Sequence, residues 1–325
     1  MSAYDDLMAH ARETVALGQV LGRLSWDQET VMPRGAAPQR AEELAAMEKV
    51  LHARKTDPRV AEWLAAAEPA DEVQAANLRL VARAHARATK VPARLAAEIA
   101  RVTSLAQGVW AEARADDDMA AFAPVLEDVL RLRREEADAL ATSDGAHARY
   151  DALLEDYEPG ASSESIAAMF DALRPRLVAL RDRILGAGRP VPRLYGTFDR
   201  EAQLQLSREV ARAFGYDADR GRIDLAVHPF SSGSGLDVRI TTRVDPADPL
   251  GCVYSTIHEV GHAGYEQGID RAHLLTPLGE GVSMGVHESQ SRIYENQLGR
   301  SRAFTGWLFG RMREVFGAFG VPDPK

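Results

Sequence analysis

The sequence predicts a mainly helical protein with a small β-sheet or hairpin at about residues 221–244. Apolar residues recur at helical spacing through most of residues 1–215, and shorter alternating segments replace this pattern afterwards. A further helical segment follows and contains His258-Glu259-Val260-Gly261-His262. We therefore expect a single domain over 1–325, with the β element and the histidine helix in its second part, 216–325.

The composition excludes several classes of function. The chain has 325 residues and a formal net charge of −9, so it lacks the basic surface expected of a protein that binds nucleic acid or an anionic membrane. The single cysteine, Cys252, cannot form an internal disulfide, which suits a reducing compartment. The N-terminus shows no secretory signal, and no window has the apolar length of a membrane helix. We expect a soluble, cytoplasmic protein.

The helical pattern divides into segments separated by proline and glycine. The expected helices in order are 4–25, 38–54, 57–68, 71–89, 92–115, 118–142, 162–188, a segment that ends near Phe214, the histidine helix, which ends near Gly268, and 283–296. Residues 26–33 interrupt the first pattern, and Pro33 with Gly35 predicts a turn.

The β region consists of two alternating segments and a connection. Residues 221–230 and 237–244 alternate and are rich in β-branched side chains, whereas 231–235 is a turn-forming run of serine and glycine. This arrangement predicts a hairpin with a moderately long connection.

The second of these strands carries polar residues on one face. Asp237, Arg239 and Thr241 share that face. One interpretation is a half-buried strand whose polar face meets water. The other is that the strand walls a substrate groove, where it pairs with an extended peptide or offers Arg239 to a carboxylate.

The histidine segment carries the chemistry. His258 and His262 are four residues apart, so both rings lie on one face of a helix and can turn a nitrogen to one point. Two imidazoles with an adjacent carboxylate, Glu259, form the usual arrangement of a zinc hydrolase, with two metal ligands and a general base.

A catalytic zinc ion normally takes a third protein ligand. Glu266 lies on the same helical face, but ligands at i, i+4 and i+8 span roughly 12 Å, too far for bonds of about 2 Å to one ion. The third ligand must come from another element. Glu280, in a glycine-flanked loop, is possible, and Glu288 is better because the next helix can pack back against the first.

Several motifs in order resemble the carboxypeptidase Taq family of metallocarboxypeptidases. The segments that carry the resemblance are Trp26-Asp-Gln-Glu-Thr with Met32-Pro33, Tyr157-Glu-Pro-Gly160, His228-Pro-Phe230, Asp237-x-Arg239-x-Thr241, the HEVGH segment, and His287-Glu-Ser-Gln290. The resemblance implies a mostly helical fold with a short sheet beside a deep active-site groove that carries the HExxH helix. It also implies homodimers and zinc, with cobalt as the alternative.

The resemblance also assigns roles. It implies His258, His262 and Glu288 as metal ligands and Glu259 as the base. Two motifs that the family places beside the substrate, IRxxAD and Gly-x-x-Gln-Asp-x-x-Trp, have no counterpart after Arg311. We therefore expect a member that lacks its C-terminal portion.

The expected activity is metal-dependent hydrolysis of C-terminal residues from peptides. One alternative is an endopeptidase or dipeptidase with the same metal site. The other is an inactive helical fragment that binds metal or serves as a module for association with other proteins.

Candidates for substrate binding come from the β region. Arg239 is the candidate that binds the substrate's carboxylate, and Asp237 and Thr241 are further candidates for substrate binding. His228 is either an oxyanion donor or, as we favour, a turn histidine. His287 points to another helical face, so we expect it to support a metal ligand or to pack against its neighbours. Either Glu295 or Asp270 is expected to orient a ligand imidazole. We expect Gln290 and Arg292 to be structural.

Overall fold

The computed structural model describes residues 2–143, 145–190 and 192–321, and it is mainly helical with a small sheet, as the sequence predicts. Its α-helices are α1 Ala3–Thr30, α2 Ala37–Lys55, α3 Pro58–Ala66, α4 Glu72–Ala88, α5 Ala93–Ala115, α6 Met119–Leu140, α7 Ala146–Leu154, α8 Ser163–Gly186, α9 Arg200–Ala213, α10 Pro249–Gln267, α11 Met284–Arg292 and α12 Arg302–Phe316. A π-helical segment, Ile293–Leu298, continues α11. Short 3₁₀ turns occur at Arg34–Ala36, Ala218–Arg220, Arg271–His273 and Pro277–Gly279.

Many of these helices begin at a side-chain cap. Ser2, Asp71 and Ser162 each accept a hydrogen bond from a backbone N–H of the first turn, which would otherwise lack a partner. The expected break after residue 25 is wrong, because α1 continues to Thr30. Trp26 is buried there, and Arg40 holds the Asp27 carboxylate at 2.6 Å, so α2 supports the extra turn.

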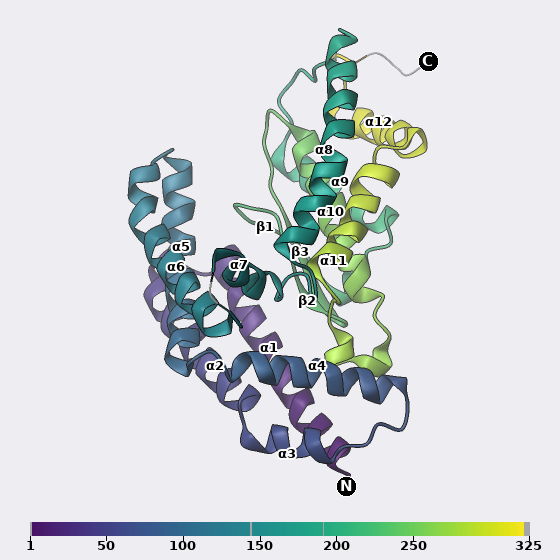
Figure 1. Ribbon diagram of the computed structural model, residues 1–325. Helices are drawn as coiled ribbons and strands as arrows, with labels where there is room; N and C mark the ends of the chain where they lie inside the picture. Colours follow the sequence, from purple (N-terminus) through teal and green to yellow (C-terminus); the bar gives the residue numbers. More distant parts are fainter. Residues whose placement is uncertain (1, 144, 191, 322–325) are drawn as a thin grey trace.

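The helices form two groups on either side of the sheet. Figure 1 shows α1 to α4 at one end of the molecule, the antiparallel pair α5 and α6 standing beside them, and α9 to α12 at the other end. Helix α1 packs against the sheet, and α4 packs against the turn Pro277–Gly279. The N-terminal helices α1 and α4 therefore face elements of the second part of the chain, residues 216–325.

The sheet has the strands β1 Ile223–Leu225, β2 Ser231–Ser234 and β3 Asp237–Thr242, in the order β1-β3-β2. Strand β1 is parallel to β3, and β2 is antiparallel to it. The expected hairpin between 221–230 and 237–244 is therefore wrong in its pairing: the serine-glycine run is itself the antiparallel partner of β3. A turn at Gly235, where φ is +63°, joins these two strands.

The core of the second group holds α10 in place. One face of α10 packs with α9 and α12, and another packs on β3. The buried residues of these two contacts are Phe198, Leu206, Val210, Val253, Ile257, Leu308, Met312 and Phe319 in the first, and Ala211, Tyr216, Val238, Ile240, Val260 and Ala263 in the second. Each large apolar side chain buried here contributes about 1.5–3 kcal/mol to stability. The histidine helix is thus fixed on two sides.

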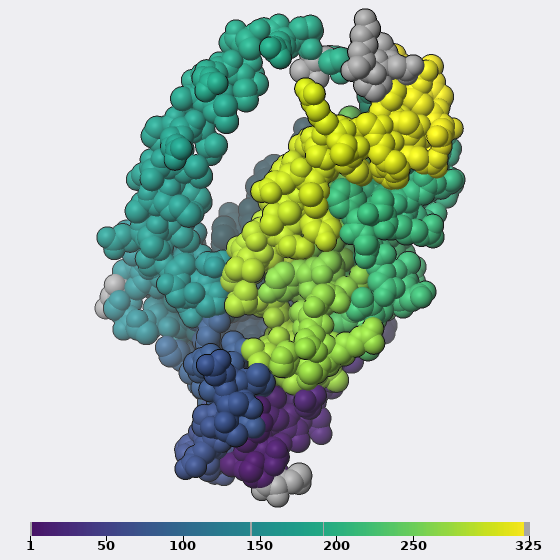
Figure 2. Space-filling model, turned by 90° about the vertical axis from the view of Figure 1, so that its right-hand side faces the viewer, coloured from purple at the N-terminus to yellow at the C-terminus, as the bar shows by residue number. Residues whose placement is uncertain are grey.

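None of the residues of helix α8 is buried, and most of them are exposed to solvent. Its apolar stripe, which the helical spacing predicts as a packed face, is exposed to solvent; it comprises Met169, Phe170, Leu173, Leu177 and Leu180. Figure 2 shows α8 as an arm that stands away from the C-terminal helices, with open space between them. None of the helices in the described ranges combines the length and apolarity that crossing a bilayer requires.

Candidate metal centre

Three side chains from two helices converge on one point. The His258 and His262 Nε2 atoms on α10 are 3.2 Å apart, and Glu288 Oε2 on α11 lies 3.6 Å from the first and 3.2 Å from the second. Ligand atoms on a tetrahedral ion with bonds of about 2.0–2.2 Å are about 3.3–3.6 Å apart. Two imidazole nitrogens and a carboxylate oxygen at this spacing fit a zinc-type divalent cation, and His258, His262 and Glu288 form such a group.

A glycine allows the two helices to approach this closely. Gly261 of α10 faces the backbone of α11, and a Cβ atom on Gly261 would lie 2.5 Å from the Cα of Ser291. Only a residue without a side chain fits at this contact. The close approach brings Glu288 to the histidines, and it explains the glycine inside the HEVGH segment.

The carboxylate of Glu288 is held in place as an anion. Arg292 donates to its Oε1 at 2.8 Å, and the hydroxyl of Ser291 donates to its Oε2 at 3.1 Å. Burial opposes ionisation of Glu288, but the hydrogen bond from Ser291, the nearby His258 and Arg292 hold its pKa below the usual value. The ligand is therefore charged and pre-oriented.

The imidazole of His258 is oriented by a second carboxylate. Its Nδ1 lies 3.0 Å from Oε2 of Glu295, and this carboxylate also accepts hydrogen bonds from Arg292 at Oε2 and from Arg300 at Oε1. Of the two residues expected to orient a ligand imidazole, Glu295 makes this contact. Asp270 instead caps the turn Arg271–His273 through the backbone N–H of Ala272.

The imidazole of His262 contacts another histidine. His262 Nδ1 and His287 Nδ1 are 2.6 Å apart, and His287 Nε2 is 2.8 Å from Oε1 of Glu266. Glu266 therefore lies behind the ligand histidine, outside the ligand group, as helix length predicts. Burial, together with His287 and His258, lowers the pKa of His262 to about 4, so this ring is neutral at pH 7 and its lone pair is free for a metal.

The candidate base lies next to these ligands and is buried. Glu259 is 5% exposed, and burial, with the charge of Glu288 adding to it, raises the pKa of its carboxyl to about 8. A carboxyl group with a pKa near the working pH can accept and return a proton.

The sequence matches the family model described as Carboxypeptidase Taq (M32) metallopeptidase over residues 6–322. The chain belongs to this family. Thermostable carboxypeptidase 1 of Thermus thermophilus is 42% identical over 98% of this chain and 66% of that protein, and the Pyrococcus furiosus enzyme of the same name is 33% identical over 95% and 63%. The crystal structure of the M32 carboxypeptidase from Deinococcus radiodurans R1 superposes with a TM-score of 0.84 at 39% identity, over 97% of this chain and 64% of that one. The chain thus spans about two thirds of the length of the relatives that it matches.

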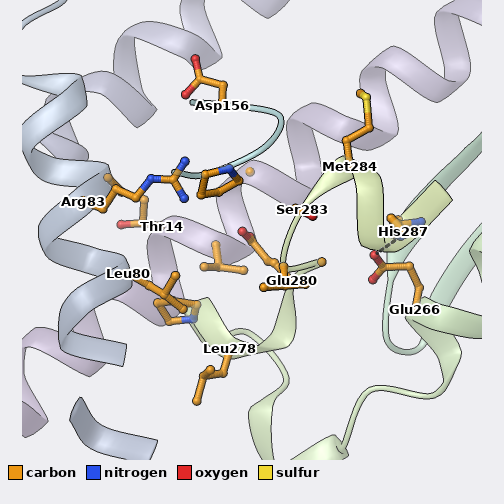
Figure 3. A pocket seen from close by; sticks show the side chains of 18 of the residues that line it. Thr14, Leu80, Arg83, Asp156, Glu266, Leu278, Glu280, Ser283, Met284 and His287 are labelled. Atoms are coloured by element: carbon orange, nitrogen blue, oxygen red, sulfur yellow. Dashed lines mark hydrogen bonds and ion pairs between the residues drawn. The ribbon is translucent and has the colours of Figure 1, made fainter. Parts of the chain in front are cut away.

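Two of the three candidate ligands of this M32 chain, His258 and His262, line a large groove of about 1090 Å³. Figure 3 shows part of its lining, with Glu280 projecting into the space between Ser283 and the wall that carries Thr14 and Arg83. Glu280, the alternative third ligand, belongs to this lining and not to the ligand group. The residue as a whole is exposed, but desolvation by the surrounding groove walls raises the pKa of its carboxyl.

The opposite wall of the groove is one that the sequence does not predict. Lys55, Arg83 and Asp156 line it, and they come from α2, α4 and the segment after α7. These residues lie more than a hundred positions before the HEVGH segment. No local pattern in the sequence relates them to the metal ligands, because their proximity is set by how α1 to α4 pack.

The four residues expected to bind substrate separate into two places. His228 lines the large groove together with His258, Glu259 and His262. Arg239 lies in a neighbouring cavity of about 270 Å³, where it pairs with Asp237 at 2.8 and 2.9 Å.

Two further contacts complete this corner of the M32 fold. The Arg239 guanidinium lies 4.3 Å from the centre of the Trp26 ring, and Arg23 also binds Asp237, at 3.1 Å. Thr241 is fully buried, where its hydroxyl accepts from the N–H of Phe230 and donates to the carbonyl of the same residue. In this structure, Asp237 and Arg239 tie α1 to β3, and Thr241 holds the segment after His228.

Proposed function

We propose that this protein is a metal-dependent carboxypeptidase that releases C-terminal residues from peptides. The observation that carries the proposal is the convergence of His258, His262 and Glu288 beside the buried Glu259 at the edge of a large groove. Family membership supports it, as do the names of the relatives, which are carboxypeptidases. Zinc is the metal that this donor set favours, and cobalt is the alternative.

In the proposed mechanism each residue has one task. His258, His262 and Glu288 hold the cation, which, when bound, supplies Lewis acidity to the attacking water and to the scissile carbonyl. The carboxylate of Glu259 takes a proton from the attacking water and returns it to the nitrogen of the leaving amine. Glu295 keeps the His258 ring in its ligating orientation, while Arg292 does the same for Glu288.

A carboxypeptidase must also recognise the free carboxylate of its substrate, and Arg239 is our candidate from the β-sheet. Its guanidinium is engaged by Asp237 and Trp26, so this role requires a substrate carboxylate to replace an internal one. Lys55 is a second candidate cation, and it lines the groove itself. The variants Arg239→Gln and Lys55→Gln separate these two cations, since loss of the anchor raises KM for peptides.

The test of the proposed function compares a peptide with its C-terminally amidated form. Sequential release of C-terminal residues from the free acid only, abolished by a chelator and restored by zinc or cobalt, is the expected result. Equal cleavage of both forms would identify an endopeptidase with the same metal site, and cleavage of dipeptides alone would identify a dipeptidase. Metal binding without any cleavage would support an inactive metal-binding or association fragment.

Two further proposals concern the assembly and the location of the protein. Homodimerisation is suggested by resemblance to the family, and sedimentation equilibrium of the purified chain tests it. A cytoplasmic location agrees with the lone cysteine, Cys252, which is buried against Ser207. Fractionation of the source cells tests this location.

A further inference from the structure

A chain of polar contacts leads away from one metal-ligating histidine. His262 Nδ1 lies 2.6 Å from His287 Nδ1, and His287 Nε2 lies 2.8 Å from Glu266 Oε1. The three residues come from both helices, since His262 and Glu266 lie on α10 and His287 lies on α11. Figure 3 shows the contact between His287 and Glu266 at the edge of the groove.

The Glu266 carboxylate at the end of this series of contacts gives the two imidazole rings a preferred direction of hydrogen bonding. A Glu266 carboxylate can only accept, so His287 Nε2 must carry the hydrogen that it donates. With His287 Nε2 donating to Glu266, the arrangement that keeps His262 Nε2 free for a metal has the Nδ1–H of His262 donating to the Nδ1 lone pair of His287 across the 2.6 Å contact. A proton on Nδ1 leaves the His262 Nε2 lone pair free, and this is the atom that points at Glu288 and His258.

The surroundings hold His287 where it must be for this purpose. Its ring lies against Tyr265, with ring centres 4.7 Å apart, and a Cβ atom on Gly281 would lie 2.9 Å from its Cδ2. Glu266 is 8% exposed, and it lines the groove together with His287. The arrangement is therefore enclosed on the side away from the groove.

The second ligand histidine is oriented by simpler means. His258 Nδ1 contacts the carboxylate of Glu295 directly, without an intervening ring. The two candidate ligands thus receive different support, a carboxylate for His258 and an imidazole for His262.

We propose that His287 and Glu266 are positioning residues that fix the tautomer of His262 and so raise the affinity of the site for its metal. This inference rests on the proposed metal site, and it adds two residues that bind no metal themselves. Neither the spacing of the HEVGH segment nor the ligand group alone identifies them.

The test measures zinc affinity by competition with a chromophoric chelator, without any substrate. The His287→Phe variant keeps a ring against Tyr265 but removes the acceptor, and we expect its dissociation constant to rise about 10–100-fold. Glu266→Gln keeps an acceptor oxygen for His287, so its zinc affinity should stay close to that of the parent. Glu266→Met has no such oxygen, so its zinc affinity should fall as much as that of His287→Phe. Tyr265→Phe keeps the ring and is the matched control, with unchanged affinity expected.

A spectroscopic measurement separates positioning from mere packing. Long-range proton–nitrogen correlation spectra of the zinc-loaded protein should show His262 protonated at Nδ1 in the parent, with that proton's signal lost or broadened in His287→Phe. Unchanged zinc affinity in both His287→Phe and Glu266→Met would overturn the proposal, even if those variants unfold more easily. If His258→Ala also binds zinc like the parent, the proposed metal site itself is wrong, which is a distinguishable result.

Discussion

Gly261 on α10 and Ser291 on α11 are in contact through their backbones. A Cβ atom on Gly261 would lie 2.5 Å from the Ser291 Cα and 3.0 Å from the carbonyl oxygen of Gln290. Both are backbone atoms, so they can move away from a Cβ atom only if α11 shifts. We expect Gly261→Ala to lower the free energy of unfolding by about 1–3 kcal/mol and to weaken metal binding, because α11 carries Glu288. Denaturant unfolding and chelator competition measure the two effects.

A control for this substitution exists elsewhere in the chain. Gly306 in α12 has nothing within 4 Å of the position that a Cβ atom would take. Gly306→Ala should therefore be neutral or stabilise by up to about 1 kcal/mol, since alanine is the better helix former. If Gly261→Ala behaves in the same way as Gly306→Ala, the contact between the two helices is not tight.

The identity of the third ligand gives the second prediction. Glu288→Ala and His258→Ala should each lose the metal on dialysis, as measured by elemental analysis, because two donors hold a cation far more weakly than three. Glu280→Ala should keep its metal, since Glu280 lines the groove outside the ligand group. Full retention of metal by Glu288→Ala combined with loss in Glu280→Ala would reverse this assignment.

The role of Glu259 gives the third prediction. Glu259→Gln has nearly the same shape but cannot accept a proton, so we expect turnover to fall by about 10²–10⁴-fold while metal content stays at the parent level. Peptide hydrolysis and elemental analysis of the same sample measure both quantities. A variant with parental turnover would show that another group is the base.

The buried position of Glu259 gives a fourth prediction, on stability and pH in the metal-free protein. The folded-state pKa is about 8 and the ordinary value is 4.5, so between these values the folded protein keeps a proton that the unfolded chain has lost. Stability should therefore fall as pH rises through this window, by up to about 1.4 kcal/mol per pH unit from this group.

The same prediction is measured by urea unfolding of chelator-treated protein at pH 5 and pH 8. Glu259→Gln removes the effect, so the parent should lose more stability than the variant between the two values. The titration of His262, whose folded pKa is about 4, is common to both proteins and does not enter the difference. Equal losses in the two proteins would show that Glu259 is ionised in the folded state.

The helices and the two histidines of the candidate metal site follow from local sequence, because both depend on residue spacing alone. The spacing of His258 and His262 fixes their common face on any helix, and the length of a helix is enough to exclude Glu266. Glu288 required more, because its place depends on how α11 packs against α10. Glu288 was expected because the family resemblance implies it and because the next helix could pack back against the histidine helix. Gly261 gives the physical reason why the two helices approach so closely.

The pairing of the sheet could not be predicted in the same way. The β2 segment, Ser231–Ser234, contains no β-branched residue, and its place beside β3 rests on backbone hydrogen bonds and the turn at Gly235. Helix α8 shows the opposite case. Its apolar spacing predicts a helix correctly, but periodicity does not reveal that this stripe is exposed.

The ligands of the candidate site come from two separate helices, with the loop from Gly268 to Ser283 between them. A cation bound by all three would act as a clasp on the folded chain, because the unfolded chain cannot hold His262 and Glu288 together without closing that loop. Free metal at a hundred times its dissociation constant would add about 2.7 kcal/mol to the free energy of unfolding. The heat resistance of this protein would then be set partly by the metal content of its surroundings, and a sample's melting temperature would report its metal supply.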